Sequence, residues 1–191
     1  MKKKSKFKLT AKQGLILSII FTLLCAVSAN LLLSNFGKVK IETTTVQTRS
    51  GDNVSIRVYS PKAATADNKA PAVVFAHGLS TTKECYAQYA LELARRGFVV
   101  VTPDMLNHGG SDITPFETFF TDMNADAYGV YSAVKYVSEL DYVDLDQIGI
   151  AGHSMGGNAT NTSVVLDNMS GNPVISAVYL VASNPLFTDF Q

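Results

Sequence analysis

Cysteine and histidine are scarce in this chain, and their positions exclude several kinds of chemistry. The 191 residues include two cysteines and three histidines. Cys25 lies in an apolar N-terminal run and Cys85 in a predicted helix, so we expect no disulfide between them. No C-x-x-C spacing of a metal or redox site occurs either. The sequence therefore predicts no structural zinc and no other metal site.

The chain also lacks a net charge. Its 16 lysine and arginine residues are balanced by 16 aspartate and glutamate residues, and the one basic block is confined to the first dozen residues. A balanced chain provides no overall field for a polyanion, so no nucleic-acid partner is expected. With 47% hydrophobic and 17% charged residues, the composition is typical of a globular protein with one additional apolar segment.

That apolar segment is the run from residue 14 to residue 33, which contains no charged side chain and follows six lysines. At about 1.5 Å per residue it is long enough to cross roughly 30 Å of hydrocarbon. The lysines are expected to stay in the cytoplasm. The sequence thus predicts a cytoplasmic N-terminus at 1–13, a single transmembrane signal anchor at 14–34 in the cell membrane, and an extracytoplasmic domain at 35–191.

A cleaved signal peptide is the alternative to an anchor. Val27-Ser28-Ala29 resembles a small-residue cleavage site, which would yield a secreted protein. The apolar run continues through Leu31-Leu32-Leu33, however, and this favours the uncleaved anchor. Leu24, directly before Cys25, is too large for a lipoprotein signal, so lipidation of Cys25 is not expected.

The remaining residues alternate between strand-type and helix-type patterns. Residues 38–59 resemble an antiparallel hairpin with its turn at Gly51-Asp52-Asn53. Short apolar runs predict buried strands at 72–76, 98–102, 148–151 and 174–181. Amphipathic stretches predict helices at 83–96 and from Asp122 or Asp126 to about 140. The fold class is therefore α/β, a doubly wound and mostly parallel sheet entered by an antiparallel hairpin.

Residues 113–121 are predicted to be a loop. Its Phe116, Phe119 and Phe120 either line an acyl or aromatic pocket or are buried under the neighbouring helix, and burial is favoured.

The pentapeptide Gly152-His153-Ser154-Met155-Gly156 follows an apolar run and precedes a helical pattern. A strand that turns directly into a helix leaves little room for side chains, which accounts for Gly152 and Gly156 on either side of the serine. The arrangement predicts a nucleophile elbow with Ser154 exposed at its tip. The backbone N–H of Met155, at the start of the new helix, would then face a developing oxyanion.

Three motifs together resemble a known family. The elbow, the sequence Ala76-His77-Gly78-Leu79 after an earlier strand, and the stretch Pro103 to Asp112 after the next strand are similar to those of α/β-hydrolase-fold serine hydrolases. The nearest resemblance is to the dienelactone-hydrolase and prolyl-oligopeptidase-like esterases and peptidases. It covers about residues 43–187 and is specific for the fold.

The resemblance implies roles for individual residues. The N–H of Leu79 would be the second oxyanion donor, and His77, Gly78 and His153 would support the site. Asp104 and His108 would belong to a structural turn rather than to the catalytic triad.

The family places an acid and then a histidine after the serine, but no histidine follows Ser154 in this chain. Asp189 is a weak candidate for the acid. By the family pattern the catalytic histidine is expected beyond Gln191, so that this chain would be the N-terminal portion of an enzyme and inactive alone.

The function expected from these features is a serine hydrolase that forms an acyl-enzyme on Ser154. A carboxylic ester is the leading small-molecule acyl substrate, with peptide and lactone as alternatives, and no cofactor is implied. The rival interpretation is a non-catalytic, membrane-tethered binding domain with a degenerate hydrolase fold. The oligomeric state remains open.

Overall fold

A computed structural model describes residues 9–183, except for the side chains of Phe116, Phe119, Phe120, Asp122 and Asn124. The chain divides into two compact units after Gly37. The first contains α1 (Ala11–Leu33), which is capped at its start by the Thr10 side chain. By length and composition α1 can cross a membrane, as either an anchor or a signal sequence.

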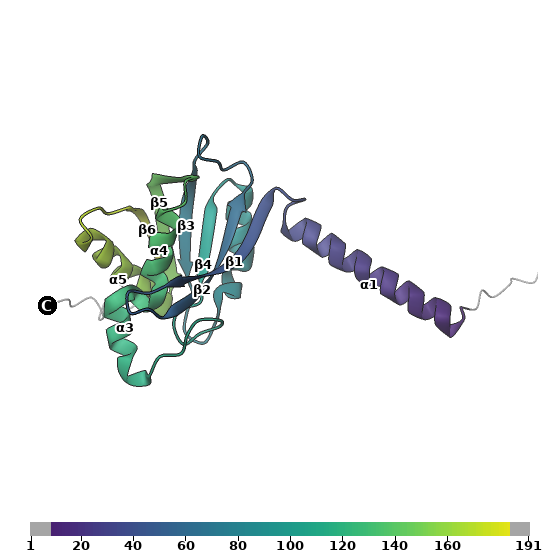
Figure 1. Cartoon of the computed structure of the whole chain (residues 1–191), viewed down its shortest axis with the longest axis horizontal. Coiled ribbons are helices and arrows are strands. Elements are labelled where there is room, and N and C mark those ends of the chain that lie inside the picture. The colour runs from purple at the N-terminus through teal and green to yellow at the C-terminus, as the bar shows by residue number, and fades with distance from the viewer. Residues whose placement is uncertain (1–8, 184–191) are drawn as a thin grey trace, which may run out of the picture. The chain divides into compact units, whose positions relative to one another are not determined.

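The second unit contains a six-stranded sheet in the order β1-β2-β4-β3-β5-β6 (Figure 1). The strands are β1 (Val39–Gln47), β2 (Asn53–Pro61), β3 (Ala70–Ala76), β4 (Val99–Pro103), β5 (Val143–His153) and β6 (Ile175–Val181). β1 and β2 form the predicted antiparallel hairpin, and β2 also pairs antiparallel with β4. The other pairs, β3 with β4, β3 with β5 and β5 with β6, are parallel. The carboxyl ends of β3, β4, β5 and β6 therefore meet at one edge of the sheet, where ligand sites of α/β proteins occur.

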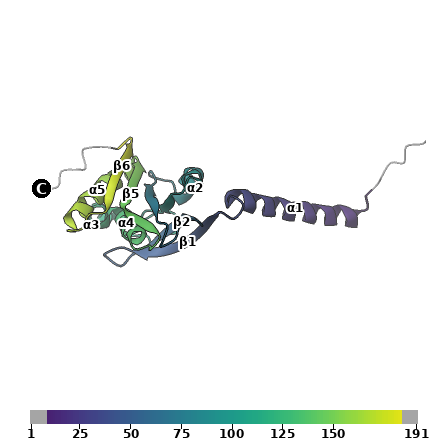
Figure 2. The same cartoon turned by 90° about the horizontal axis from the view of Figure 1, so that it is seen from above.

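Helices cover both faces of the sheet. The short 3-10 helix η1 (Lys83–Tyr86) leads into α2 (Ala87–Arg95), which packs with Val100 and Tyr59 on one face. α4 (Val130–Ser138) and α5 (Met155–Met169) pack with Val99 and Val101 on the other face. In Figure 2, α2 lies across the strands from α4 and α5. Because successive side chains of β4 point to opposite faces, one apolar strand serves both layers of the core.

The sequence prediction was wrong between residues 113 and 140. The predicted loop becomes helical from residue 116, where η2 (Phe116–Thr118) leads into α3 (Phe119–Asp126). The predicted single helix to residue 140 is interrupted, because Ala127, Tyr128 and Gly129 all have positive φ angles of 51°, 55° and 87°. Alanine and tyrosine carry no sequence signal for such a break, since their side chains disfavour this region. The expected positions of the three phenylalanine side chains lie outside the described residues.

Candidate active site

β5 ends and α5 begins around a single strained residue. Ser154 has φ 55° and ψ −120°, a backbone conformation that side-chain-bearing residues avoid. Its N–H donates to the carbonyl oxygen of Val181 at 2.9 Å, which ties the turn to β6. The serine is partly exposed at the carboxyl edge of the sheet. The structure therefore has the strand–turn–helix context that the pentapeptide predicts.

The two glycines of the pentapeptide are required by close backbone contacts. A Cβ at Gly152 would lie 2.2 Å from the carbonyl oxygen of Gly156. A Cβ at Gly156 would lie 2.4 Å from the carbonyl oxygens of both Ala76 and His77. Real side chains do not approach so closely, so glycine allows the first turn of α5 to pack directly on the end of β3.

This packing brings the two expected oxyanion donors onto adjacent segments. Met155 is the first residue of α5, and the first N–H groups of a helix have no acceptor within the helix. Leu79 lies in the loop that follows β3, residues 77–80, which we term the oxyanion loop; its side chain is 61% exposed. The same loop touches the elbow at Gly78, where a Cβ would be 3.0 Å from His153 Nδ1.

His77, the first residue of the oxyanion loop, is fully buried. Its Nε2 accepts the N–H of Met105 at 3.0 Å, so Nδ1 carries the proton and donates to the carbonyl oxygen of Gly78 at 2.7 Å. Burial lowers the pKa of His77, and the neighbouring His108 lowers it further. A neutral ring with both nitrogens in backbone hydrogen bonds organises the loop and has no free position for proton transfer.

The ring of His108, like that of His77, contacts backbone groups through both nitrogens. It lies in the loop after β4, residues 104–112, which we term the β4 loop. Its Nε2 accepts the N–H of Ser80 at 3.2 Å, and its Nδ1 lies 3.0 Å from the carbonyl oxygen of Leu106. The rings of His108 and His77 meet edge to face with centroids 5.0 Å apart. Both nitrogens are thus engaged by backbone groups.

Asp104 begins the β4 loop and is completely buried. Its carboxylate accepts the backbone N–H of Lys83 at 2.7 Å, the Lys83 ammonium and the N–H of Gly110 at 2.8 Å. Burial alone would raise the pKa of Asp104, but these donors more than offset it and the pKa is lowered. Asp104 is therefore an ionised structural group, and Ser111 extends the turn by donating to its carbonyl oxygen at 2.6 Å.

No acid–base pair for Ser154 is found among residues 9–183. His153 is exposed and flanks the serine in sequence. Asp167, in α5, accepts the N–H groups of Val174 and Ile175 at 2.8 Å each, a structural role. Asp189, the candidate acid, lies outside the described residues.

Sequence reasoning missed two buried charged residues. Lys83, at the start of η1, has a side chain that is only 8% exposed and contacts Asp104. Asp126, at the end of α3, is 2% exposed. Neither has a sequence signal, because lysine and aspartate are almost always exposed and their burial depends on partners far along the chain.

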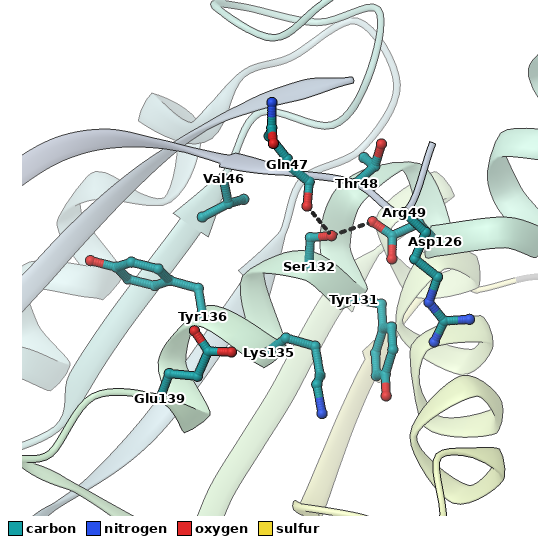
Figure 3. Close-up of a pocket in the computed structure, with 10 residues that line it drawn as sticks. All are labelled: Val46, Gln47, Thr48, Arg49, Asp126, Tyr131, Ser132, Lys135, Tyr136 and Glu139. Atoms are coloured by element: carbon teal, nitrogen blue, oxygen red, sulfur yellow. Dashed lines mark hydrogen bonds between the residues drawn. The ribbon is translucent and has the colours of Figure 1, made fainter. Parts of the chain in front are cut away.

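Asp126 lines a cavity of about 460 Å³ between β1 and α4. Figure 3 shows the Ser132 hydroxyl between the Gln47 carbonyl and the Asp126 carboxyl, bonded to both. Burial raises the pKa of Asp126 to about 6, against the opposing effects of Ser132 and Arg49. The Arg49 guanidinium lies over the Tyr131 ring, 5.1 Å from its centroid. None of the elbow residues lines this cavity.

A smaller apolar cavity of about 290 Å³ lies beside the elbow on the α2 face of the sheet. It is lined by Phe75, Tyr86, Tyr89, Gly152, His153, Tyr179 and Val181. Tyr179 is 65% exposed and Val181 40% exposed, so this side of β6 presents apolar surface.

Comparison with known proteins agrees with the geometry. Residues 73–190 match the family model described as the alpha/beta hydrolase family. Over 133 residues the chain is 32% identical to the acyltransferase drtE of Aspergillus calidoustus, a match that covers 69% of this chain and 41% of that protein.

Solved structures are similar as well. A hypothetical protein from Pseudomonas aeruginosa superposes with a TM-score of 0.64 at 27% identity, over 77% of this chain and 44% of that one. An esterase from Pyrobaculum calidifontis superposes with a TM-score of 0.58 at 26% identity, over 79% of this chain and 48% of that one. The chain thus spans less than half the length of these relatives. From the match over residues 73–190 and the elbow at Ser154, the chain belongs to the alpha/beta hydrolase family.

Proposed function

We propose that this chain carries the nucleophile of a serine hydrolase that acts on carboxylic esters through an acyl-enzyme on Ser154. The observation that carries the proposal is the strained backbone of Ser154, at φ 55° and ψ −120° between β5 and α5. Strain at one partly exposed serine, with close-packed glycines on both sides, is a feature of functional sites. Family membership and the named esterase among the similar structures support ester chemistry.

In the proposed mechanism the Ser154 Oγ attacks the substrate carbonyl carbon and its proton passes to a general base. The carbonyl oxygen becomes an oxyanion that accepts hydrogen bonds from the N–H groups of Met155 and Leu79. The alcohol leaves with a proton, an acyl-enzyme remains on Oγ, and water then releases the acid. The described residues supply the nucleophile and the donors. The general base and its acid are proposed for the whole protein. The relatives are more than twice as long as the part of them that this chain matches.

We also propose that the protein is attached to a membrane. α1 would hold the hydrolase unit at the membrane with its lysine-rich N-terminus in the cytoplasm. Serine peptidase activity and a non-catalytic binding role are the alternatives, since the same elbow serves peptide bonds and a fold can persist without its base.

The test is ester hydrolysis by the full-length gene product with a short-chain p-nitrophenyl ester. We expect an initial burst of p-nitrophenol, which indicates that an acyl-enzyme accumulates. In Ser154→Ala we expect the hydrolysis rate to fall by about a thousandfold or more. Ser170→Ala, an exposed serine at the end of α5, is the matched control and should keep the wild-type rate. Cleavage of peptides but not esters would favour the peptidase, and unchanged hydrolysis in Ser154→Ala would overturn the proposal.

A further inference from the structure

Two histidines join the oxyanion loop and the β4 loop, because each accepts a hydrogen bond from a backbone N–H of the other loop. His77, on the oxyanion loop, accepts an amide proton from Met105 of the β4 loop at 3.0 Å. His108, on the β4 loop, accepts an amide proton from Ser80 of the oxyanion loop at 3.2 Å. Each histidine thus fixes the backbone of the loop to which it does not belong.

The bond from Ser80 is placed where it controls the expected oxyanion donor. Ser80 directly follows Leu79 and has a positive φ of 59°. Fixing the Ser80 N–H fixes the peptide group between these residues, and with it the ψ angle of Leu79. A side-chain-bearing residue in the left-handed region needs such support, because the conformation costs of order 1–3 kcal/mol.

We propose that His108 is a positioning residue of the hydrolase site, holding the Leu79 N–H in line for the oxyanion through its acceptor bond to Ser80. This inference rests on the proposed function of Ser154 for its catalytic consequence, but the bond itself can be tested separately. His108 touches no reacting atom. Its effect passes through the oxyanion loop.

The bond exists only while Nε2 of His108 is unprotonated, because the Ser80 N–H can only donate. His77 is fully buried, and burial lowers the pKa of His77, so this half of the pair stays neutral. His108 is partly exposed, and its ring meets the His77 ring edge to face.

Three variants of the full-length protein separate positioning from folding. His108→Ala removes the acceptor. His108→Gln replaces it with an amide oxygen at similar reach that does not titrate. Asn107→Ala is the matched control in the same loop, since its side chain bonds to Thr114 and not to the oxyanion loop.

The first readout is amide hydrogen exchange of Ser80, which needs no activity. In His108→Ala we expect it to be at least about tenfold faster than in the wild type, and in Asn107→Ala unchanged. The second readout is the rate at which a fluorophosphonate labels Ser154 at neutral pH. We expect the labelling rate of His108→Ala to be about tenfold lower than that of the wild type, a smaller loss than deleting an oxyanion donor causes. His108→Gln, which keeps an acceptor for the Ser80 N–H, should retain most of the wild-type labelling rate.

Ser80 exchange that is the same in His108→Ala and the wild type would overturn the inference. Equal labelling rates in all variants would overturn the catalytic consequence while leaving Ser154 as the nucleophile. If no variant is labelled but Ser80 exchange responds as expected, the proposed function fails and the loop contact stands. Should His108→Ala not fold, His108→Gln decides: Ser80 exchange close to that of the wild type is expected, and exchange at least about tenfold faster would contradict the acceptor role.

Discussion

Asp104 in the β4 loop and Asp126 at the end of α3 are both buried carboxyl groups, yet their pKa values shift in opposite directions. Asp104 accepts two backbone N–H groups and the Lys83 ammonium, and its pKa is lowered. Asp126 has the Ser132 hydroxyl and a more distant Arg49, and burial raises its pKa to about 6. The difference shows that donors, rather than depth, decide whether a buried acid is ionised.

The two residues also give opposite pH dependences of stability. Because the pKa of Asp104 is depressed on folding, its contribution is present at neutral pH and lost as the pH falls through the folded value. Because the pKa of Asp126 is raised on folding, its contribution is present in acid and lost as the pH rises through about 6. The ionised group holds the loops next to the elbow, whereas the weakly partnered group lines a separate cavity.

The largest expected effect comes from breaking the Asp104 cluster. Asp104→Ala leaves the Lys83 ammonium buried without its partner, and breaking a buried pair costs about 3 to 5 kcal/mol of unfolding free energy. Urea unfolding of the full-length protein measures the loss. Glu92→Ala, which breaks an exposed pair with Arg95 and Arg96, is the control and should change stability little. Equal effects of the two variants would contradict the structural role of Asp104.

A second change tests the same cluster through the backbone. Gly109 has φ +54°, and a Cβ there would lie 2.2 Å from the Asp104 carboxyl carbon. Gly51 has φ +94° with no atom within 4 Å of the added Cβ. Gly51→Ala should therefore cost only the backbone strain, about 1 kcal/mol, and Gly109→Ala at least about 2 kcal/mol. Thermal unfolding of both variants measures the difference, and a Gly109→Ala effect no larger than that of Gly51→Ala would show that the carboxylate can move aside.

Ser132 is the link on which Asp126 depends. Its hydroxyl has one proton but contacts two acceptors, the Gln47 carbonyl at 3.0 Å and the Asp126 carboxyl. As a donor to Asp126 the hydroxyl stabilises the ionised carboxylate and lowers the pKa of Asp126 against the larger effect of burial. Ser132→Ala should cost about 1 to 2 kcal/mol and move the pKa of Asp126 still higher. Chemical denaturation and a side-chain carbonyl NMR titration check the two parts, and Ser138→Ala on the same helix is the control.

The smallest expected effect is the pH dependence from Asp126. With a folded pKa of about 6, the group should remove roughly 1 kcal/mol of stability between pH 5 and pH 8. Asp126→Asn keeps an acceptor for the Ser132 hydroxyl but does not titrate, so it should abolish this part of the slope. Unfolding free energies of the two proteins across that range give the comparison. A slope that is identical in the variant would show that Asp126 does not titrate there.

The sequence could predict those features that depend on local pattern. The hairpin, the buried strands and the elbow follow from alternation, apolar runs and a serine between glycines, and the structure confirms these elements. The left-handed break at residues 127–129 could not be predicted, because the residues themselves do not favour it.

The site was predictable only in part for a related reason. Ser154 and its glycines lie within five residues and form a recognisable motif. The contacts of His77 with Met105 and of Ser80 with His108 join residues 28 positions apart, and the burial of Lys83 depends on Asp104, 21 positions later. Such contacts depend on how β3 and β4 pair, which a single sequence does not specify locally.

The proposed role of Ser154 as a nucleophile is tested most directly by the intact mass of the full-length protein after treatment with a fluorophosphonate, followed by mapping of the modified peptide. We expect one phosphonyl adduct on Ser154 in the wild type and in Ser170→Ala, and none in Ser154→Ala. A folded wild-type protein that gains no adduct, or gains one elsewhere, would contradict the account and favour a binding domain that retains only the fold.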